Sequence, residues 1–265
     1  MSNQNSTNEV MGQQPEQKSL LKRNSKLMTA AIIVAVLALG AFAFNYFYLQ
    51  PKEAKAQADM TPGMAYLDEA AQYNYMYANS FQMPDSLKND SIKNAALEIK
   101  KNADAAYNKA LNGDGKYPGF LKIAQESMTD AANLAKANAG ICYFHLGQME
   151  KAVEFLESYS PKGDKTLSAQ YVAALGNSYA SLKTPNYDKA VSSLKEAAKI
   201  ADNATLSPNY LLDAALLLEK QNKNEEALQV YTQIKNDYPL CELCRTLNGV
   251  SNGSQIDKYI ERVSK

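Results

Sequence analysis

The stretch ANAGICYFHLGQMEKAVEFL, residues 137–156, places small and large residues at the spacing of two packed helices. Gly140 is followed by Tyr143 three positions later, and Ala152 is followed by Leu156 four positions later. Residues three and four apart share one face of an α-helix, so each pair marks an inward face. The small residue lets a second helix approach, and the large residue fills the groove beside it. The stretch therefore predicts a helix–turn–helix unit.

The same spacing recurs twice further along the chain. The first unit also has Gly147 in its turn. The matching residues of the second unit are Gly176, Tyr179, Ala190, Leu194 and Ala197, and those of the third unit are Ala215, Leu218, Ala227, Tyr231, Ile234 and Pro239. The anchoring alanines 152, 190 and 227 lie 38 and 37 positions apart. A period of this length is typical of stacked repeats in which each unit buries its apolar face against the next.

The remainder of the chain beyond residue 50 shows the same helical periodicity and no strict apolar–polar alternation. We expect an all-α fold with helices at 53–80, 90–111, 117–128, 131–146, 149–159, 166–182, 186–201, 207–222, 224–236 and 255–263. Residues 59–130 are interpreted as a degenerate N-terminal helical pair plus a connecting helix. Residues 131–265 then hold three repeats and a C-terminal cap, whose helix 255–263 covers the last repeat.

An apolar segment near the N-terminus predicts a transmembrane anchor at 27–49. Its first eighteen residues, 27–44, carry no charge, and about 20 such residues cross a bilayer as a helix. The four basic residues of 18–26 predict a cytoplasmic N-terminus by the positive-inside rule. Residues 1–26 are then a disordered cytoplasmic tail, 50–58 a linker, and the repeats are periplasmic at the inner membrane. The alternative is a cleaved signal peptide, for which AQA at 56–58 resembles a cleavage site.

The repeats resemble the tetratricopeptide family, although the early tryptophan often found there is absent. With the anchor, the chain resembles the YfgM-like family of ancillary subunits of the bacterial SecYEG translocon. The phrases ALNGDGKYPGF, ANAGICYFHLGQMEKAVEFL and IDKYIERV are similar to its Bacteroidetes-type members. The resemblance implies a membrane-anchored adaptor for protein export. Its partners would be translocon subunits, a periplasmic chaperone or exported clients.

In the tetratricopeptide register, the first helix of each repeat lines a concave, partner-binding face. The residues implied are Leu134, Ala137, Ile141, Phe144 and His145, then Gln170, Ala173, Asn177, Ala180 and Ser181, then Asn209, Leu212, Leu216, Glu219 and Lys220. Repeats that clamp a terminal carboxylate carry Lys and Asn in the first repeat, where this chain has Ala137 and Ile141. An apolar or extended partner segment is therefore the better match.

The composition argues against catalysis and against nucleic-acid binding. Lys and Arg total 28, as do Asp and Glu, so no net positive field is available to hold nucleic acid. His145 is the single histidine, and no nucleophile–base arrangement surrounds it in the sequence. We expect no enzyme activity, no metal and no cofactor. A scaffold for cell-envelope assembly or division is the alternative function, and a thiol- or metal-dependent enzyme is a third.

The segment PLCELCR, residues 239–245, carries Cys241 and Cys244 in a C-x-x-C spacing. A thioredoxin-type site needs a preceding strand, and none is predicted here. The pair is then interpreted as buried or free thiols or as a local disulfide. A zinc site formed with Cys142 and His145 has suitable ligands, but two repeats separate the two pairs.

Overall fold

The computed structural model describes residues 17–80, 90–126, 128–245 and 253–264. Across these ranges the secondary structure is helical and includes no strand, which confirms the all-α prediction. The chain divides into two compact units, Met1–Lys52 and Glu53–Lys265, and each is described by itself.

The first unit contains the apolar segment. Helix α1 spans Gln17–Phe44 and passes into a π-helical turn, η1, at Asn45–Leu49. The apolar side chains from Leu27 to Tyr48 are almost all exposed, and the helix is long and apolar enough to cross a membrane. A signal sequence near the N-terminus can meet the same criteria of length and composition. Residues 17–26, expected in a disordered tail, are helical instead, because Lys, Leu and Arg extend a helix that is already nucleated.

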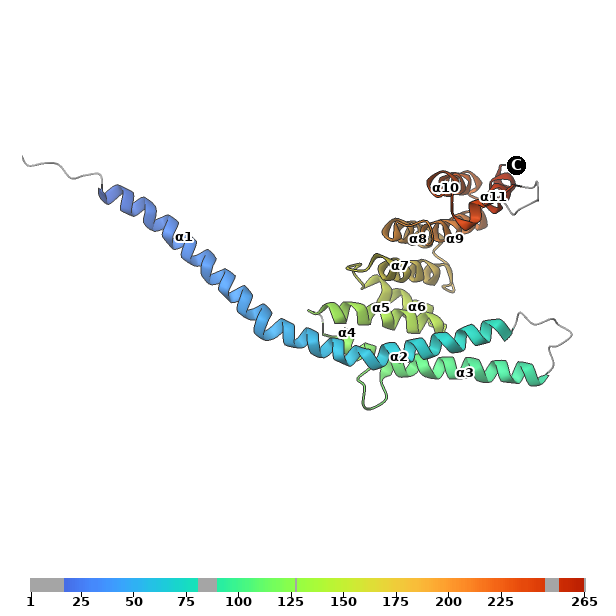
Figure 1. The fold of residues 1–265 in the computed structure, drawn as a ribbon, viewed down its shortest axis with the longest axis horizontal. Coiled ribbons are helices and arrows are strands. Elements are labelled where there is room, and N and C mark those ends of the chain that lie inside the picture. The colour runs from blue at the N-terminus through green and yellow to red at the C-terminus, as the bar shows by residue number, and fades with distance from the viewer. Residues whose placement is uncertain (1–16, 81–89, 127, 246–252, 265) are drawn as a thin grey trace, which may run out of the picture. The chain divides into compact units, whose positions relative to one another are not determined.

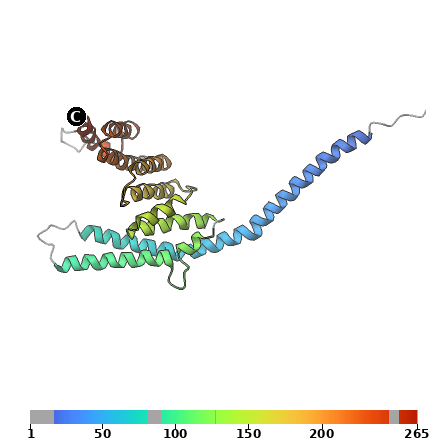
Figure 2. The same ribbon diagram turned by 180° about the vertical axis from the view of Figure 1, so that it is seen from behind.

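The second unit begins with two long helices, α2 (Gln50–Ser80) and α3 (Asp90–Asn112), which lie side by side and antiparallel in Figures 1 and 2. Asn74 Nδ2 donates to the hydroxyl of Tyr107 at 2.7 Å, joining the two helices. Residues 50–58, expected as a linker, form the start of α2. There Ala56 is buried, and the Glu53 carboxylate accepts from the backbone N–H of Ala131 at 3.1 Å. That carboxylate satisfies a free N–H at the start of the helix that begins at Asp130, so α2 is held against the first helical pair.

The remaining helices follow in order, each packed against its neighbours (Figure 1). They are α4 (Phe120–Ala124), α5 (Asp130–His145), α6 (Met149–Glu157), α7 (Lys165–Ala180), α8 (Tyr187–Ala201), α9 (Ser207–Lys220), α10 (Asn224–Asp237), the short 3₁₀ turn η3 (Glu242–Cys244) and α11 (Gln255–Val263). The predicted helix ends fall within two residues of these bounds from α5 onward, and α11 matches its prediction at both ends. The predicted helix 117–128 is shortened to α4.

The recurring small and large positions are buried in all three helical pairs. Their members are Gly140, Tyr143, Ala152 and Leu156, then Gly176, Tyr179, Ala190 and Leu194, then Ala215, Leu218, Ala227 and Tyr231. A methyl group built on Gly140 would lie 2.5 Å from Cγ of Leu156, closer than two carbon atoms can approach. The glycine therefore sets the distance between α5 and α6.

Candidate functional site

The first helix of the predicted binding face, α5, packs against α6, α4 and α3, and side chains of α2 hydrogen-bond to it. Ala137 is fully buried, so its side chain offers no surface to a partner. Leu134, Ile141 and Phe144 are half-buried and pack on the apolar cluster that also contains Ala103 of α3. Because these apolar side chains gain by burial in the cluster, they leave only part of their surface to a partner.

His145 contacts side chains of α2 and α3. Its ring stacks on Tyr107 with the centroids 4.8 Å apart, and its Nδ1 lies 3.4 Å from Nδ2 of Asn74. Burial against these groups lowers the pKa of His145, and the positive charge of Lys100 lowers it further. His145 as a whole is exposed, and no carboxylate accompanies the imidazole among these contacts, so the arrangement fits a surface histidine stacked on one ring face rather than a general base.

The later part of the predicted face is more open. In α7 and its C-cap, Gln170 and Ser181 are exposed, Asn177 and Ala180 are half-buried, and Ala173 is buried. In α9, Asn209, Leu216 and Lys220 are exposed and Leu212 is half-buried.

Glu219, the remaining residue of this face, is engaged within the fold. Its carboxylate accepts from the hydroxyl of Tyr231 and from Nη2 of Arg262, the latter at 2.6 Å. Glu219 thus ties α9 to α10 and α11, and its charge is already paired.

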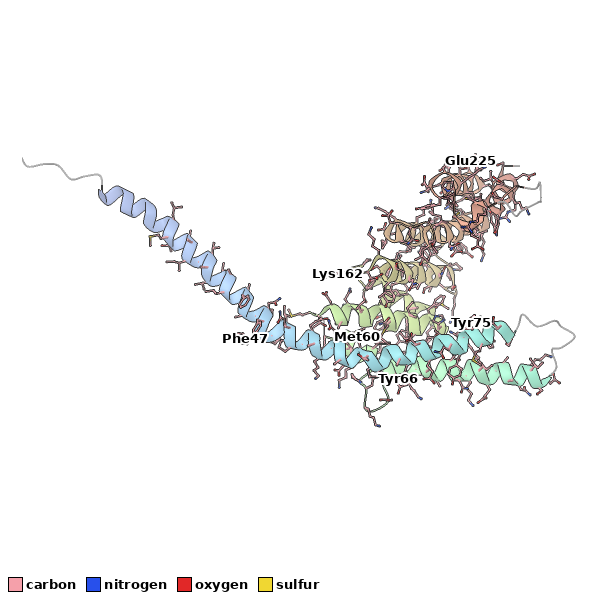
Figure 3. The ribbon with its side chains drawn as sticks, viewed as in Figure 1. Phe47, Met60, Tyr66, Tyr75, Lys162 and Glu225 are labelled. Carbon is pink, nitrogen blue, oxygen red and sulfur yellow. The ribbon has the colours of Figure 1, made fainter. Side chains whose placement is uncertain are left out.

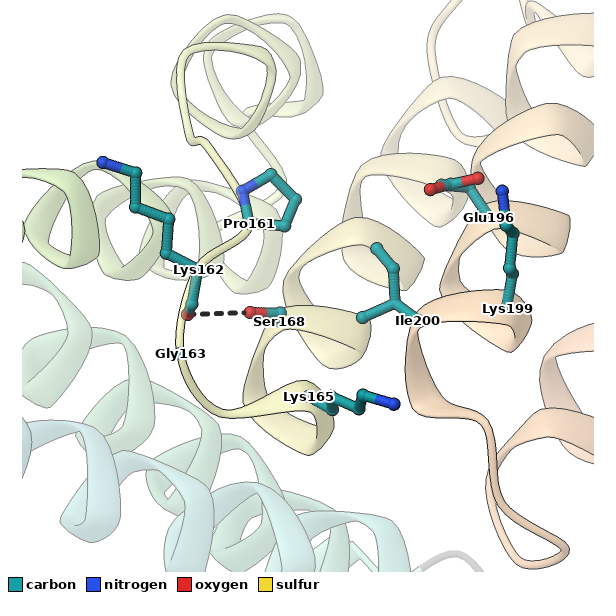
Figure 4. A pocket seen from close by; sticks show the side chains of 8 residues that line it. All are labelled: Pro161, Lys162, Gly163, Lys165, Ser168, Glu196, Lys199 and Ile200. Carbon is teal, nitrogen blue, oxygen red and sulfur yellow. Dashed lines mark hydrogen bonds between the residues drawn. The ribbon is translucent and has the colours of Figure 1, made fainter.

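A second candidate surface lies along the C-terminal half of α8. Two adjoining hollows of about 330 and 390 Å³ share Lys199, and we call them together the lysine groove. The first, drawn in Figure 4, is lined by Pro161, Lys162, Gly163, Lys165, Ser168, Glu196, Lys199 and Ile200. The second is lined by Lys195, Ala198, Lys199, Asp202, Leu211, Gln233 and Tyr238.

The lysine groove has a local excess of positive charge. Its lining holds four lysines and two carboxylates. Lys165 pairs with Asp202 at 3.3 Å, and Lys162, in the loop before α7 (Figure 3), lies 3.7 Å from a carboxylate of α5. Lys195 and Lys199 have no ion-pair partner in the described part of the chain. Exposed pairs of this kind are weak, so the groove keeps a net attraction for acidic groups.

The groove is formed by segments from successive units of the repeat. Its first hollow lies between the loop after α6, the start of α7 and the end of α8, and its second lies between the end of α8, α9 and the end of α10. The groove was not predicted from the sequence, because the tetratricopeptide register assigns the binding face to the first helix of each unit. The available signal was Lys195 and Lys199, spaced four apart on the exposed face of a helix whose alanines face inward.

The structure does not bring the possible zinc ligands together. Cys142 is buried within α5, and burial raises the pKa of its thiol to about 12. Cys241 and Cys244 lie beyond α10, and no group of three or more His, Cys, Asp or Glu suited to a metal occurs among the described residues.

Cys241 and Cys244 do lie next to each other. Their sulfur atoms are 3.3 Å apart, at hydrogen-bonding distance, and both are free thiols in this structure. Cys241 is buried and Cys244 is half-buried.

Comparison with known proteins returned no family model, no curated protein and no solved structure that matches this chain.

Proposed function

We propose that this protein is a membrane-anchored, non-catalytic scaffold of the tetratricopeptide type that binds segments of other proteins. The observation that carries the proposal is the stack of three similar helical pairs, α5–α6, α7–α8 and α9–α10, in one chain with an exposed apolar helix. Stacked helical pairs provide long continuous surfaces for extended partners. The apolar helix supports anchoring, and the basic residues before it favour a cytoplasmic N-terminus with periplasmic repeats.

Within this proposal, the partners are translocon subunits, a periplasmic chaperone associated with them, or exported clients. The support for this assignment is the resemblance of the repeats and the anchor to the YfgM-like family. A scaffold for cell-envelope assembly or division has the same anchor and the same repeats, so the identity of the bound proteins distinguishes the two functions.

The lysine groove is the surface we propose for the partner. It combines ammonium groups without an ion-pair partner among the described residues, at Lys195 and Lys199, with apolar surface from the half-buried Ile200. This chemistry suits an extended segment that carries acidic and apolar side chains in turn. The exposed residues of α9, such as Leu216, provide the competing surface on the opposite helix of the unit.

Affinity purification of the full-length protein after mild solubilisation tests the function. We expect translocon and chaperone subunits to be enriched. Recovery of peptidoglycan or outer-membrane assembly proteins instead would favour the alternative scaffold, and no enrichment of either set would refute the proposal.

Variants of single surfaces then locate the binding site. The double variant Lys195→Glu and Lys199→Glu should lose the partners, because it reverses the charge of the groove. The control Lys183→Glu makes the same change on the exposed loop before α8, outside the groove, and should retain them. If Leu216→Ala loses the partners and the groove variant does not, the binding surface is the face of α9.

A further inference from the structure

The cysteine pair lies at the junction between the last helical pair and the cap. Cys241 precedes the 3₁₀ turn η3, and the backbone N–H of Cys244 donates to the Cys241 carbonyl at 3.0 Å. This hydrogen bond closes a tight turn that holds the two sulfur atoms 3.3 Å apart. Forming an S–S bond of about 2.05 Å from this position requires a side-chain movement of little more than an ångström.

One side of this turn is anchored in the folded core. Cys241 and Leu243 are buried in the apolar cluster that α8, α9 and α10 form with Ile256 of α11. Beside it, Lys235 of α10 donates to Asp257 of α11 at 2.7 Å. The turn therefore lies against the residues that attach the cap helix.

The two thiols differ in access. Cys241 is only 5 % exposed, whereas Cys244 is partly open to solvent. Cys142, the third cysteine, is fully buried in α5. Because a disulfide reagent must reach the sulfur that attacks it, Cys244 is the accessible entry point, and Cys241 is better placed to attack a sulfur already attached to Cys244.

We propose that Cys241 and Cys244 form a thiol–disulfide exchange site, at which a disulfide oxidant closes an intramolecular disulfide that makes the turn η3 rigid and thereby steadies the cap helix packed against it. The Cys244 thiol loses a proton and its sulfur attacks one sulfur of the oxidant, whose S–S bond breaks and releases one thiol. The Cys241 thiol then loses its proton and attacks Cys244 Sγ in the mixed disulfide, releasing the second thiol. The protein gives up two electrons and two protons, and the oxidant's disulfide is reduced to two thiols.

The groups around Cys244 determine the rate of the first step. Burial, followed by the hydrogen bond that the Cys244 thiol shares with Cys241, raises the pKa of Cys244 to about 11, so little thiolate is present at neutral pH. The exchange should therefore accelerate as the pH rises from 7 to 9. This inference concerns a different part of the chain from the lysine groove and does not depend on the proposed function.

The test uses the purified, reduced, full-length protein in detergent, with oxidised glutathione as the oxidant. After acid quenching, alkylation and trypsin digestion, residues 236–245 form one peptide that contains both cysteines. We expect this peptide to be recovered without alkyl groups and about 2 Da lighter than its free dithiol form, by loss of two hydrogens, while Cys142 remains fully alkylated. A peptide that stays reduced and alkylated at oxidant levels that oxidise a free dithiol peptide of the same sequence would overturn the proposal.

Single variants test the order of the two steps. Cys241→Ser should stop at a glutathione adduct on Cys244, and Cys244→Ser should gain an adduct on Cys241 several-fold more slowly. Equal rates, or a faster reaction at Cys241, would contradict the assignment of the entry thiol. In the oxidised wild-type protein, amide hydrogen exchange in α11 should slow relative to the reduced form, and unchanged exchange would show that the disulfide does not steady the cap helix.

Discussion

Replacing Gly140 with alanine tests whether the close approach of α5 and α6 holds the first helical pair together. The added methyl group would lie 2.5 Å from Cγ of Leu156, against an optimal carbon–carbon separation of about 3.5–4.0 Å. Leu156 is 3 % exposed and cannot turn outward, so the helices must separate by about 1 Å. Overpacking of this kind costs about 1–3 kcal/mol, and the higher helix propensity of alanine offsets about 1 kcal/mol.

We therefore expect Gly140→Ala to destabilise the protein by about 1 kcal/mol, within a range of about 0–2 kcal/mol. In a unit of the size of Glu53–Lys265, that loss of stability lowers the midpoint of thermal unfolding by roughly 2–4 °C. The measurement is a thermal melt of the full-length protein in detergent, followed by circular dichroism at a helix-sensitive wavelength.

The decisive comparison is the same substitution in a Leu156→Ala background. Leu156→Ala alone should cost about 2–5 kcal/mol, because it leaves a cavity opposite Gly140. With the large side chain gone, the new methyl group of Gly140→Ala loses its two closest contacts and keeps one, with the backbone nitrogen of residue 156 at 3.2 Å, so most of its propensity gain of about 1 kcal/mol remains. The substitution should thus destabilise the wild type and stabilise the variant. If it changes stability in the same direction in both backgrounds, the close-approach argument is refuted.

Three other substitutions test separate parts of the molecule. Glu219→Gln weakens the charged hydrogen bond to Arg262 and should speed hydrogen exchange in α11, at a cost of about 1–2 kcal/mol. The hydrogen bond from Lys235 is the main cause that lowers the pKa of Asp257 to about 2. That contribution to stability is present above the ordinary carboxyl pKa near 4 and is lost as the pH falls toward 2. Acid should therefore release the cap helix in the wild type and have a smaller effect in Asp257→Asn. Amide hydrogen exchange in α11 measures this difference. Leu37→Arg puts a charge in the middle of the apolar helix and should weaken membrane insertion by about 3 kcal/mol, which carbonate extraction of membranes would detect.

Local sequence patterns were sufficient to place the helices of the repeats. From α5 to α11 each helix combines an inward stripe of small and large residues with a turn on either side, and both signals depend on neighbours within a few positions. The predicted helix ends were less accurate where the helical periodicity weakens. The N-terminal helix begins at Gln17 rather than at residue 27, since helix propagation does not stop where the apolar stretch stops.

Contacts between distant segments were beyond the reach of those patterns. The binding face was expected to begin on α5, but Ala137 is buried and His145 stacks on Tyr107 of α3. The sequence shows that α5 has an apolar face but not which surface covers it. The lysine groove was missed for a related reason, because its lining comes from helix ends that are about one repeat apart along the chain.

The sequence by itself determined that this protein is helical, that its helices recur in pairs, and that one apolar segment is long enough to cross a bilayer. Those properties depend on periodicity and composition, which each segment carries alone. Only the tertiary structure decided which faces remain open, that Glu219 is occupied by Arg262, and that Cys241 and Cys244 come within 3.3 Å. Burial and distance depend on which distant segments pack together, and that choice is made by the free energy of the whole fold rather than by any one helix.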